Sequence, residues 1–303
     1  MGFWQMYIFM HVVEQKSFSA AAKVCNLSQP TVSAHIRQLE EYLGCPVVDR
    51  VGRRIMVTQA GRILYGYAKK LVALKEEAET AISVFQGVLK GTVTIGASTI
   101  PGIYIFPPVL STFRKRYPNI RVTLEISSSG QVLEKVAEGI LELSIVGIKS
   151  DHKLLRQIRM VEDEMLLAIP EDHRWRKRDC ISFETLKKEP FIKREDSSGT
   201  WRTFRQSLNK AGYDTDELNV VAEVQHSNGV ISGVKSGLGV SVLSSVAIAN
   251  EQHHRGLRAL KISHVDHSRS FYLTWNAHRS FSPIAGLLKD FIIDHFEAGE
   301  QQQ

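Results

Sequence analysis

The chain of 303 residues contains little cysteine. Its three cysteines, Cys25, Cys45 and Cys180, are odd in number and show no CxxC spacing, so they favour a reducing compartment over a disulfide framework. We interpret them as small buried hydrophobic side chains. The length excludes a peptide hormone or a disulfide mini-protein, because one domain takes about 100 to 200 residues and this chain should contain about two or three.

The sequence also lacks a long apolar run. No stretch approaches the ~18 uncharged apolar residues that a membrane-spanning helix requires. The apolar segment 3–13 contains Gln5 and His11, has no basic flank before it, and is followed by Glu14 and Lys16 instead of a small-residue cleavage site. We therefore expect a core-facing helix there, no signal peptide, a cytoplasmic location and no membrane partner.

Catalytic motifs are missing as well. There is no Gly-x-Ser-x-Gly elbow, no His-Glu-x-x-His and no Walker loop with its lysine, which argues against a hydrolase or another enzyme. The eleven histidines include His253-His254 and His264-x-x-His267, but none has carboxylate or cysteine partners at metal-ligand spacing. We predict no catalytic residues, no metal site and no cofactor.

Basic residues are concentrated near the N-terminal end. Residues 1–70 carry nine Lys and Arg against four Asp and Glu, a net charge of +5, whereas the whole chain carries +6. The rest of the chain is therefore nearly neutral. This distribution is typical of a nucleic-acid-binding head on a neutral body, although a solvated basic face would also produce it.

Two short helices joined by a tight turn are predicted in this basic part. Ser17 and Ser28 are suitable N-caps, Pro30 falls in the first turn of the second helix, and Asn26 and Gly44 end the two helices. Apolar residues of the second helix recur at helical spacing. Its other face then exposes the polar residues Gln29, Thr31, Ser33, His35 and Arg37.

These exposed residues suit base recognition, because Gln pairs bidentately with adenine, Arg with guanine, and Ser and Thr with several bases. We predict a helix-turn-helix that binds double-stranded DNA through Ser28, Gln29, Pro30, Thr31, Ser33 and Arg37. Two β-rich runs, 47–48 and 55–57, follow. They predict a hairpin whose basic tip places Arg53 and Arg54 at phosphates or in the minor groove, a solvated turn being the alternative.

Residues 6–66 resemble the winged helix-turn-helix of LysR-type transcriptional regulators. The matching segments are SFSAAA at 17–22, LSQPTVS at 27–33, IRQLE at 36–40, LG at 43–44 and TQAG at 58–61. The resemblance implies that Gln29, Pro30, Thr31 and Ser33 enter the major groove and that Arg53 lies on the wing.

A long helix without proline is predicted over residues 59–89. Its apolar residues form a heptad seam: Leu64, Leu71, Ala78 and Phe85, with Tyr67, Leu74, Ala81 and Val88 three positions after each. An a/d pattern of this kind predicts a coiled coil and hence a homodimer. A helix buried on its own chain would show the same stripe, but the head offers too little surface to cover it. Similar proteins pair through this helix and often form homotetramers.

Strands alternate with helices after Gly91, which predicts a parallel sheet with helices on its faces. The predicted strands are 92–97, 121–127, 143–146, 164–169, 220–224, 240–243 and 271–275. The predicted helices are 103–117, 131–138, 201–211, 230–236 and 283–296.

Segments 133–146 and 237–244 resemble the effector-binding half of the LysR family, whose two Rossmann-like lobes are related to periplasmic binding proteins. The implied fold is an α/β effector domain of two lobes, preceded by an all-α winged helix-turn-helix head and a long coiled-coil linker helix. The predicted boundaries are 1–58 for the head, 59–90 for the linker and 91–303 for the effector domain, with lobe I at 91–162 and 268–297 and lobe II at 163–267. A solute-binding protein would also have such lobes, but it would have a signal peptide and no head.

Hydroxyl groups gather at three places where strands end and helices begin, at 98–99, 127–130 and 197–200. Helix N-termini at the carboxyl ends of strands bind anions. We predict a small anion or polar metabolite as effector, bound by Ser98, Thr99, Ser128, Ser129, Ser198 and Thr200. Lys193, Arg194 and His226 would add positive charge. Capping alone is the alternative for Ser128, which has capping-box spacing to Gln131.

The Ser98-Thr99 pair also resembles the oxyanion-binding, Thr-rich turn in the cysteine-metabolism branch of the family. The next two residues, Ile100 and Pro101, depart from that pattern.

Overall fold

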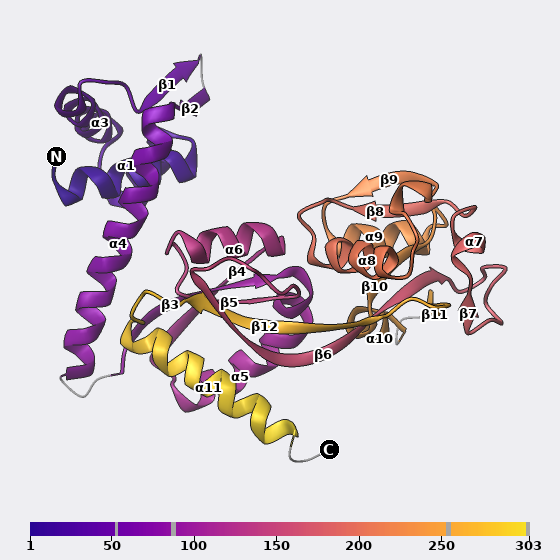
Figure 1. Cartoon of the computed structure of the whole chain (residues 1–303). Coiled ribbons are helices and arrows are strands. Elements are labelled where there is room, and N and C mark those ends of the chain that lie inside the picture. Colours follow the sequence, from indigo (N-terminus) through magenta and orange to yellow (C-terminus); the bar gives the residue numbers. More distant parts are fainter. Residues whose placement is uncertain (52–53, 86–88, 253–255, 301–303) are drawn as a thin grey trace. The chain divides into compact units, whose positions relative to one another are not determined.

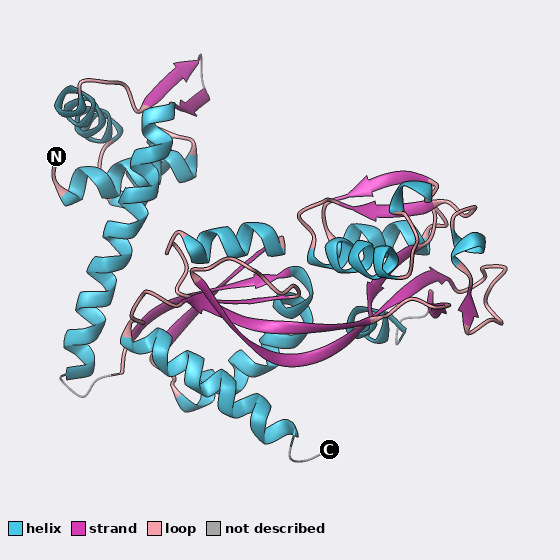
Figure 2. Cartoon of the chain, in the orientation of Figure 1, coloured by secondary structure: helices cyan, strands magenta, loops and turns pink. Residues whose placement is uncertain are grey.

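The chain folds into two units, Met1–Val88 and Leu89–Gln303, each with its own hydrophobic core. The computed structural model describes residues 1–51, 54–85, 89–252 and 256–300. Figure 1 follows the chain through both units, and Figure 2 shows helices throughout and most of the strands in the second unit.

Three helices form the core of the first unit: α1 (Phe3–Gln15), α2 (Phe18–Cys25) and α3 (Gln29–Leu43). The predicted caps are present, since the side chains of Ser17 and Ser28 accept hydrogen bonds from backbone N–H groups at the starts of α2 and α3. Asn26 and Gly44 end these helices in the left-handed conformation, with φ of 53° and 70°. The core residues include Ile8, Phe9, Ala21, Val32, Ile36 and Leu39.

A two-stranded antiparallel hairpin, β1 (Val48–Val51) and β2 (Arg54–Val57), follows, and α4 (Gln59–Phe85) leaves it. The Thr58 side chain links the two parts, because it donates to the carbonyl of Pro46 and accepts from Gly61 N at 2.9 Å. A Cβ at Gly61 would lie 2.0 Å from the carbonyl oxygen of Val47. Glycine at this position therefore lets α4 start directly against the hairpin.

The long helix is shorter than predicted. It is described as far as Phe85, residues 86–88 lie outside the described part of the chain, and Leu89, its predicted last residue, is not helical. Leu64 packs against the core of the first unit. Further along α4, the seam residues Tyr67, Leu71 and Leu74 are exposed.

A mixed sheet in the order β4-β3-β5-β12-β6-β11-β7 runs through the second unit, and β10 also pairs with β6. Its parallel part consists of β3 (Gly91–Ser98), β4 (Ile120–Ser127) and β5 (Leu143–Val146). The strand β12 (Ser268–Asn276) is antiparallel to both β5 and β6 (Leu155–Pro170). The sheet is therefore not wholly parallel, contrary to the prediction from the strand-helix alternation.

The first lobe surrounds β3, β4 and β5. Its helices are the π-helix η1 (Pro101–Ile105), α5 (Phe106–Arg116), α6 (Ser129–Ala137) and α11 (Pro283–Glu300). In Figure 1, α6 lies on one face of this part of the sheet, and α5 and α11 on the other.

The second lobe follows β6. Its strands are β7 (Cys180–Ile181), β8 (Phe191–Arg194), β9 (Val220–Val224), β10 (Ser241–Ser244) and β11 (Leu257–Ile262). Its helices are α7 (Phe183–Leu186), α8 (Gly199–Lys210), the 3-10 helix η2 (Thr215–Glu217), α9 (Ser227–Lys235) and α10 (Ser245–Gln252).

The strand β6 connects the lobes. Its first half pairs with β12, and its second half pairs with β10 and β11. The prediction at 164–169 captured only this second half, and the predicted lobe boundary after residue 162 falls inside one continuous strand. Sequence periodicity also missed β7, α7, β8, α10 and β11.

Among the described residues, no helix has both the length and the apolar character needed to cross a bilayer.

Candidate functional site

One face of α3 carries the residues predicted to contact DNA. Ser28, Gln29, Pro30, Thr31 and Arg37 are exposed, and Ser33 is partly exposed. Their positions are fixed from the opposite face, where Val32, Ile36 and Leu39 are buried in the core.

The start of α3 is held by local hydrogen bonds. The Ser28 hydroxyl accepts from Thr31 N at 3.3 Å and lies 2.7 Å from the Thr31 hydroxyl. The Gln29 amide donates to the Ser33 hydroxyl at 3.0 Å. This hydrogen bond orients the Gln29 amide group along the exposed face of α3. On DNA, the amide can replace its hydrogen bond to Ser33 with hydrogen bonds to the edge of a base.

The hairpin tip is described only in part. Arg54 begins β2, whereas the predicted wing residue Arg53 lies outside the described residues.

In the second unit, the three predicted hydroxyl clusters line one small cavity, called here the inner pocket. Its volume is about 20 Å³. It is lined by Ser98, Thr99, Ile100, Ser128, Ser129, Gly147, Arg194, Ser198, Gly199, Thr200, Ser227, Arg269 and Phe271. Both lobes thus contribute to the inner pocket: Ser98 and Ser129 belong to the first lobe, and Ser198 and Ser227 belong to the second.

Helix N-termini supply much of the inner pocket. Ser128 forms a complete capping box with Gln131 at the start of α6, and Ser198 accepts from Trp201 N at the start of α8. The start of α9 contributes Ser227. Three helices of eight or more residues therefore direct N–H groups and the positive ends of their dipoles toward the same space.

Two residues expected to add positive charge lie elsewhere. His226 is exposed and does not line the inner pocket, and its neighbour Ser227 does. Lys193 forms ion pairs with Asp196 and Glu223, and these hydrogen bonds raise the pKa of its ammonium group.

Arg269 of β12 is a buried cation of the inner pocket, with 3% of its side chain exposed. Its Nε donates to Asp163 Oδ2 at 2.6 Å, and its Nη1 donates to the Thr200 hydroxyl at 2.9 Å. Its guanidinium carbon lies 4.8 Å from the centre of the Phe271 ring. The remaining group, Nη2, is buried and has no hydrogen-bond partner among the described residues. Burial lowers the pKa of Arg269, but an arginine remains charged after such a shift.

Arg194 of β8 is the second buried cation, and 4% of its surface is exposed. It forms two hydrogen bonds to the Glu195 carboxylate, at 2.9 and 3.0 Å. It also donates to the Ser227 hydroxyl at 2.5 Å and to the Gln225 carbonyl at 2.9 Å. Arg194 therefore holds the start of α9 against the inner pocket.

Sequence reasoning missed Arg269 and its partner Asp163. A signal for both exists in the strand alternation. Arg269 shares its inward face of β12 with Phe271 and Leu273, and Asp163 precedes Met165 at the same spacing of two in β6. A charged residue at a position where alternation predicts a buried side chain is costly unless paired, and it therefore indicates a partner or a ligand.

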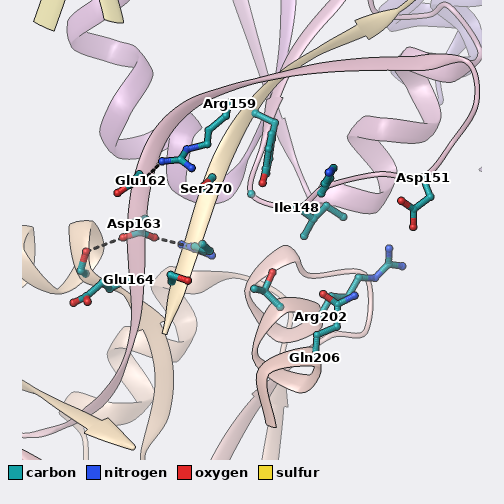
Figure 3. A pocket seen from close by; sticks show the side chains of 16 residues that line it. Ile148, Asp151, Arg159, Glu162, Asp163, Glu164, Arg202, Gln206 and Ser270 are labelled. Carbon is teal, nitrogen blue, oxygen red and sulfur yellow. Dashed lines mark hydrogen bonds and ion pairs between the residues drawn. The ribbon is translucent and has the colours of Figure 1, made fainter. Parts of the chain in front are cut away.

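A larger cavity adjoins the inner pocket and is called here the outer cavity. Its volume is about 780 Å³, and Gly147 and Arg269 line both spaces. In Figure 3, Arg159, Glu162 and Asp163 lie on β6 on one side, and Ile148, Asp151, Arg202 and Gln206 lie together on the other. The remaining lining residues are Lys149, Glu164, Thr203, Ser245, Ser268, Ser270 and Tyr272.

No group of three or more His, Cys, Asp or Glu side chains within the described ranges is arranged to hold a metal ion.

Two family models match the chain. The model for the LysR substrate binding domain matches residues 86–297, and the model for the bacterial regulatory helix-turn-helix protein of the lysR family matches residues 3–62. A probable RuBisCO transcriptional regulator from Nostoc sp. (strain PCC 7120 / SAG 25.82 / UTEX 2576) is 32% identical over 302 residues, which cover 99% of this chain and 90% of that protein.

Two solved structures show the same fold. Full-length CbnR complexed with its target DNA superimposes with a TM-score of 0.73 at 16% identity, covering 98% of this chain and 99% of that chain. The regulatory domain of CcmR from Synechocystis PCC6803, in complex with 2-PG, gives a TM-score of 0.62 at 22% identity, covering 68% of this chain and 97% of that chain.

The chain therefore belongs to the LysR family, and the resemblance seen in its motifs is confirmed. It is a DNA-binding transcriptional regulator with a two-lobed α/β effector domain, a class of regulators and not of enzymes.

Proposed function

We propose that this regulator responds to a small anion held in the inner pocket. The observation that carries the proposal is the convergence of three helix N-termini and two buried guanidinium groups on one cavity between the lobes. Charge-assisted hydrogen bonds to such groups are about twice as strong as neutral ones. The CcmR domain, solved in complex with 2-PG, supports a small metabolite as effector.

The proposed contacts are those predicted from the sequence, with three changes. Ser98, Thr99, Ser128, Ser129, Ser198 and Thr200 stay as hydroxyl donors and Arg194 stays as a cation, whereas Arg269 is added, Lys193 is left out and Ser227 replaces His226. Binding across both lobes would favour one arrangement of the lobes and thereby change how the protein acts on DNA.

For DNA, we propose contact through Ser28, Gln29, Pro30, Thr31, Ser33 and Arg37 on α3 and through Arg53 and Arg54 on the hairpin. CbnR complexed with DNA has the same fold and supports this mode of action. Binding to the genome further leads us to propose a cytoplasmic location in a bacterium.

The exposed seam of α4 supports a homodimer, and assembly into a homotetramer is part of the same proposal. Tyr67, Leu71 and Leu74 are 62%, 41% and 60% exposed, although heptad spacing places them on one stripe. An apolar stripe of this kind is typical of a helix that pairs with a second copy.

A thermal denaturation experiment on the full chain tests the anion proposal. A ligand that binds only the folded state raises the melting temperature as the logarithm of its concentration. Inorganic phosphate should produce such a rise. Thr99→Ala and Ser129→Ala should reduce it, whereas Thr112→Ala, an exposed threonine of α5 outside both cavities, should not. Equal shifts in all variants would place the anion elsewhere.

A further inference from the structure

The inner pocket and the outer cavity differ greatly in size, and they meet at Arg269. The inner pocket of about 20 Å³ has room for a group the size of one or two water molecules. The outer cavity of about 780 Å³ lies within the range of small-molecule sites. An effector confined to the inner pocket would leave the outer cavity unexplained.

Most residues that line the outer cavity have polar or charged side chains. Hydroxyl and amide side chains come from Thr203, Gln206, Ser245, Ser268, Ser270 and Tyr272. Most of its acidic groups have partners, because Glu162 pairs with Arg159, Glu164 with Lys261 and Asp163 with Arg269. Its one aliphatic side chain larger than alanine is Ile148. Such a lining favours a ligand whose uncharged part carries hydroxyl groups over one whose uncharged part is a hydrocarbon, because buried polar groups need hydrogen-bond partners.

Arg269 connects the two spaces chemically. Asp163 and Thr200 hold its Nε and Nη1, so the guanidinium plane is fixed. Nη2, with no partner in the structure, is the remaining donor of a side chain that lines both the inner pocket and the outer cavity. An unpaired donor on a buried cation is costly, and an anionic group at this junction would satisfy it.

We propose that the inner pocket and the outer cavity form one effector site for a hydroxylated organic phosphate or carboxylate. The anionic group binds Arg269 Nη2 at the junction of the two spaces, with its oxygens toward the inner pocket, and the part of the ligand that carries hydroxyl groups extends into the outer cavity along the face of α8 that carries Thr203 and Gln206. This inference rests on the proposed function, since it assumes that the inner pocket binds an anion.

Calorimetric titration of the full chain with three probes tests the inference. Glycerol 3-phosphate and phenyl phosphate share a phosphate monoester and differ in their bodies, and inorganic phosphate has no body. We expect glycerol 3-phosphate to bind at least about fivefold more tightly than either of the others, the effect of one additional hydrogen bond.

Substitutions in the outer cavity distinguish binding there from binding in the inner pocket. Ser270→Phe places a bulky ring in the outer cavity and should reduce the preference for glycerol 3-phosphate while leaving phosphate binding unchanged. Gln206→Leu, on the exposed face of α8, should reduce the same preference without a core substitution. Ser232→Phe, an exposed position of α9 outside both cavities, is the matched control.

The titrations test the two-part site separately from the binding of an anion in the inner pocket. Equal affinities for glycerol 3-phosphate and phenyl phosphate, or an unchanged preference in both Ser270→Phe and Gln206→Leu, would overturn the two-part site and leave the anion proposal standing. Failure of all three probes to bind would overturn the proposed function and this inference together.

Discussion

Asp163 and Arg269 are 106 positions apart in the sequence, yet their side chains form a buried ion pair across the two strands that connect the lobes. The Asp163 side chain is 0% exposed, and its second oxygen accepts from the Ser245 hydroxyl at 2.7 Å. Both carboxylate oxygens are therefore occupied. The pair fixes Arg269 at the wall shared by the inner pocket and the outer cavity.

Asp163→Asn should lower the free energy of unfolding of the second unit by about 3 to 5 kcal/mol, because it leaves a buried cation without its counter-charge. Urea denaturation measures the loss. The matched control is Glu164→Gln, which breaks the exposed Glu164–Lys261 pair at 3.1 Å and should cost less than about 1 kcal/mol. Similar losses in the two variants would show that the Asp163 pair is not a major source of stability.

The sequence predicts the local features of the site better than the long-range ones. Ser28 and Ser128 are recognisable as caps because a cap depends on residues three positions away, and both caps are present. The contact between Asp163 and Arg269 depends on which strands become neighbours, and no spacing within either strand encodes that. Alternation alone indicates that each is buried.

The boundaries of helices and strands are also predicted less well than the caps. The helix predicted from residue 201 starts at Gly199, since apolar periodicity begins later than the capped turn. The first half of β6 was missed because its apolar residues, Leu155, Ile158, Met160 and Val161, do not recur at every second position. The sequence predicts β12 as a strand but not its antiparallel direction. That direction follows from the path of the chain, which crosses from the first lobe to the second and back before it forms β12.

Gln29→Ala should flatten the preference for one DNA sequence over others by about 1 to 3 kcal/mol, because it removes a base-edge contact. Gln38→Ala is the control, since Gln38 lies on the same helix and its side chain accepts from Gln5 at 3.4 Å. Fluorescence anisotropy with specific and scrambled duplexes measures both. An unchanged preference in the Gln29 variant would rule out this docking of α3.

Arg53→Ala should weaken binding to all duplexes alike and reduce the slope of log affinity against log salt by about 1, as expected for a lost phosphate contact. The measurement is a salt titration of DNA affinity. A slope equal to that of the parent would show that the hairpin tip does not neutralise a phosphate.

Leu71→Glu with Leu74→Glu should convert the dimer to monomers, because like charges would face each other inside an apolar seam. Sedimentation velocity at micromolar concentration reports the change. Ala73→Glu adds a charge at an exposed position outside the a and d stripe and should leave the dimer intact. Should the double variant sediment as the parent does, the dimer interface lies away from α4.

His267 should make the second unit less stable in acid. Its Nε2 accepts a hydrogen bond from Ile262 N at 2.9 Å, an arrangement open only to the neutral ring. Burial, followed by the charge of Lys261, lowers the pKa of His267 below its ordinary value of 6.5, against the opposing effect of Glu164 and Asp266.

A lowered folded-state pKa means that the unfolded chain binds more protons than the folded chain, so stability is fully present above about pH 7 and falls as the pH drops through the ordinary histidine pKa. Urea denaturation at several pH values should therefore show a steeper loss between about pH 7 and 5 in the parent than in His267→Gln, which retains an acceptor but does not titrate. The other histidines and the carboxylates contribute equally to both proteins, so the difference between the two curves isolates His267. Parallel curves would mean that protonation of His267 does not break the turn between β11 and β12.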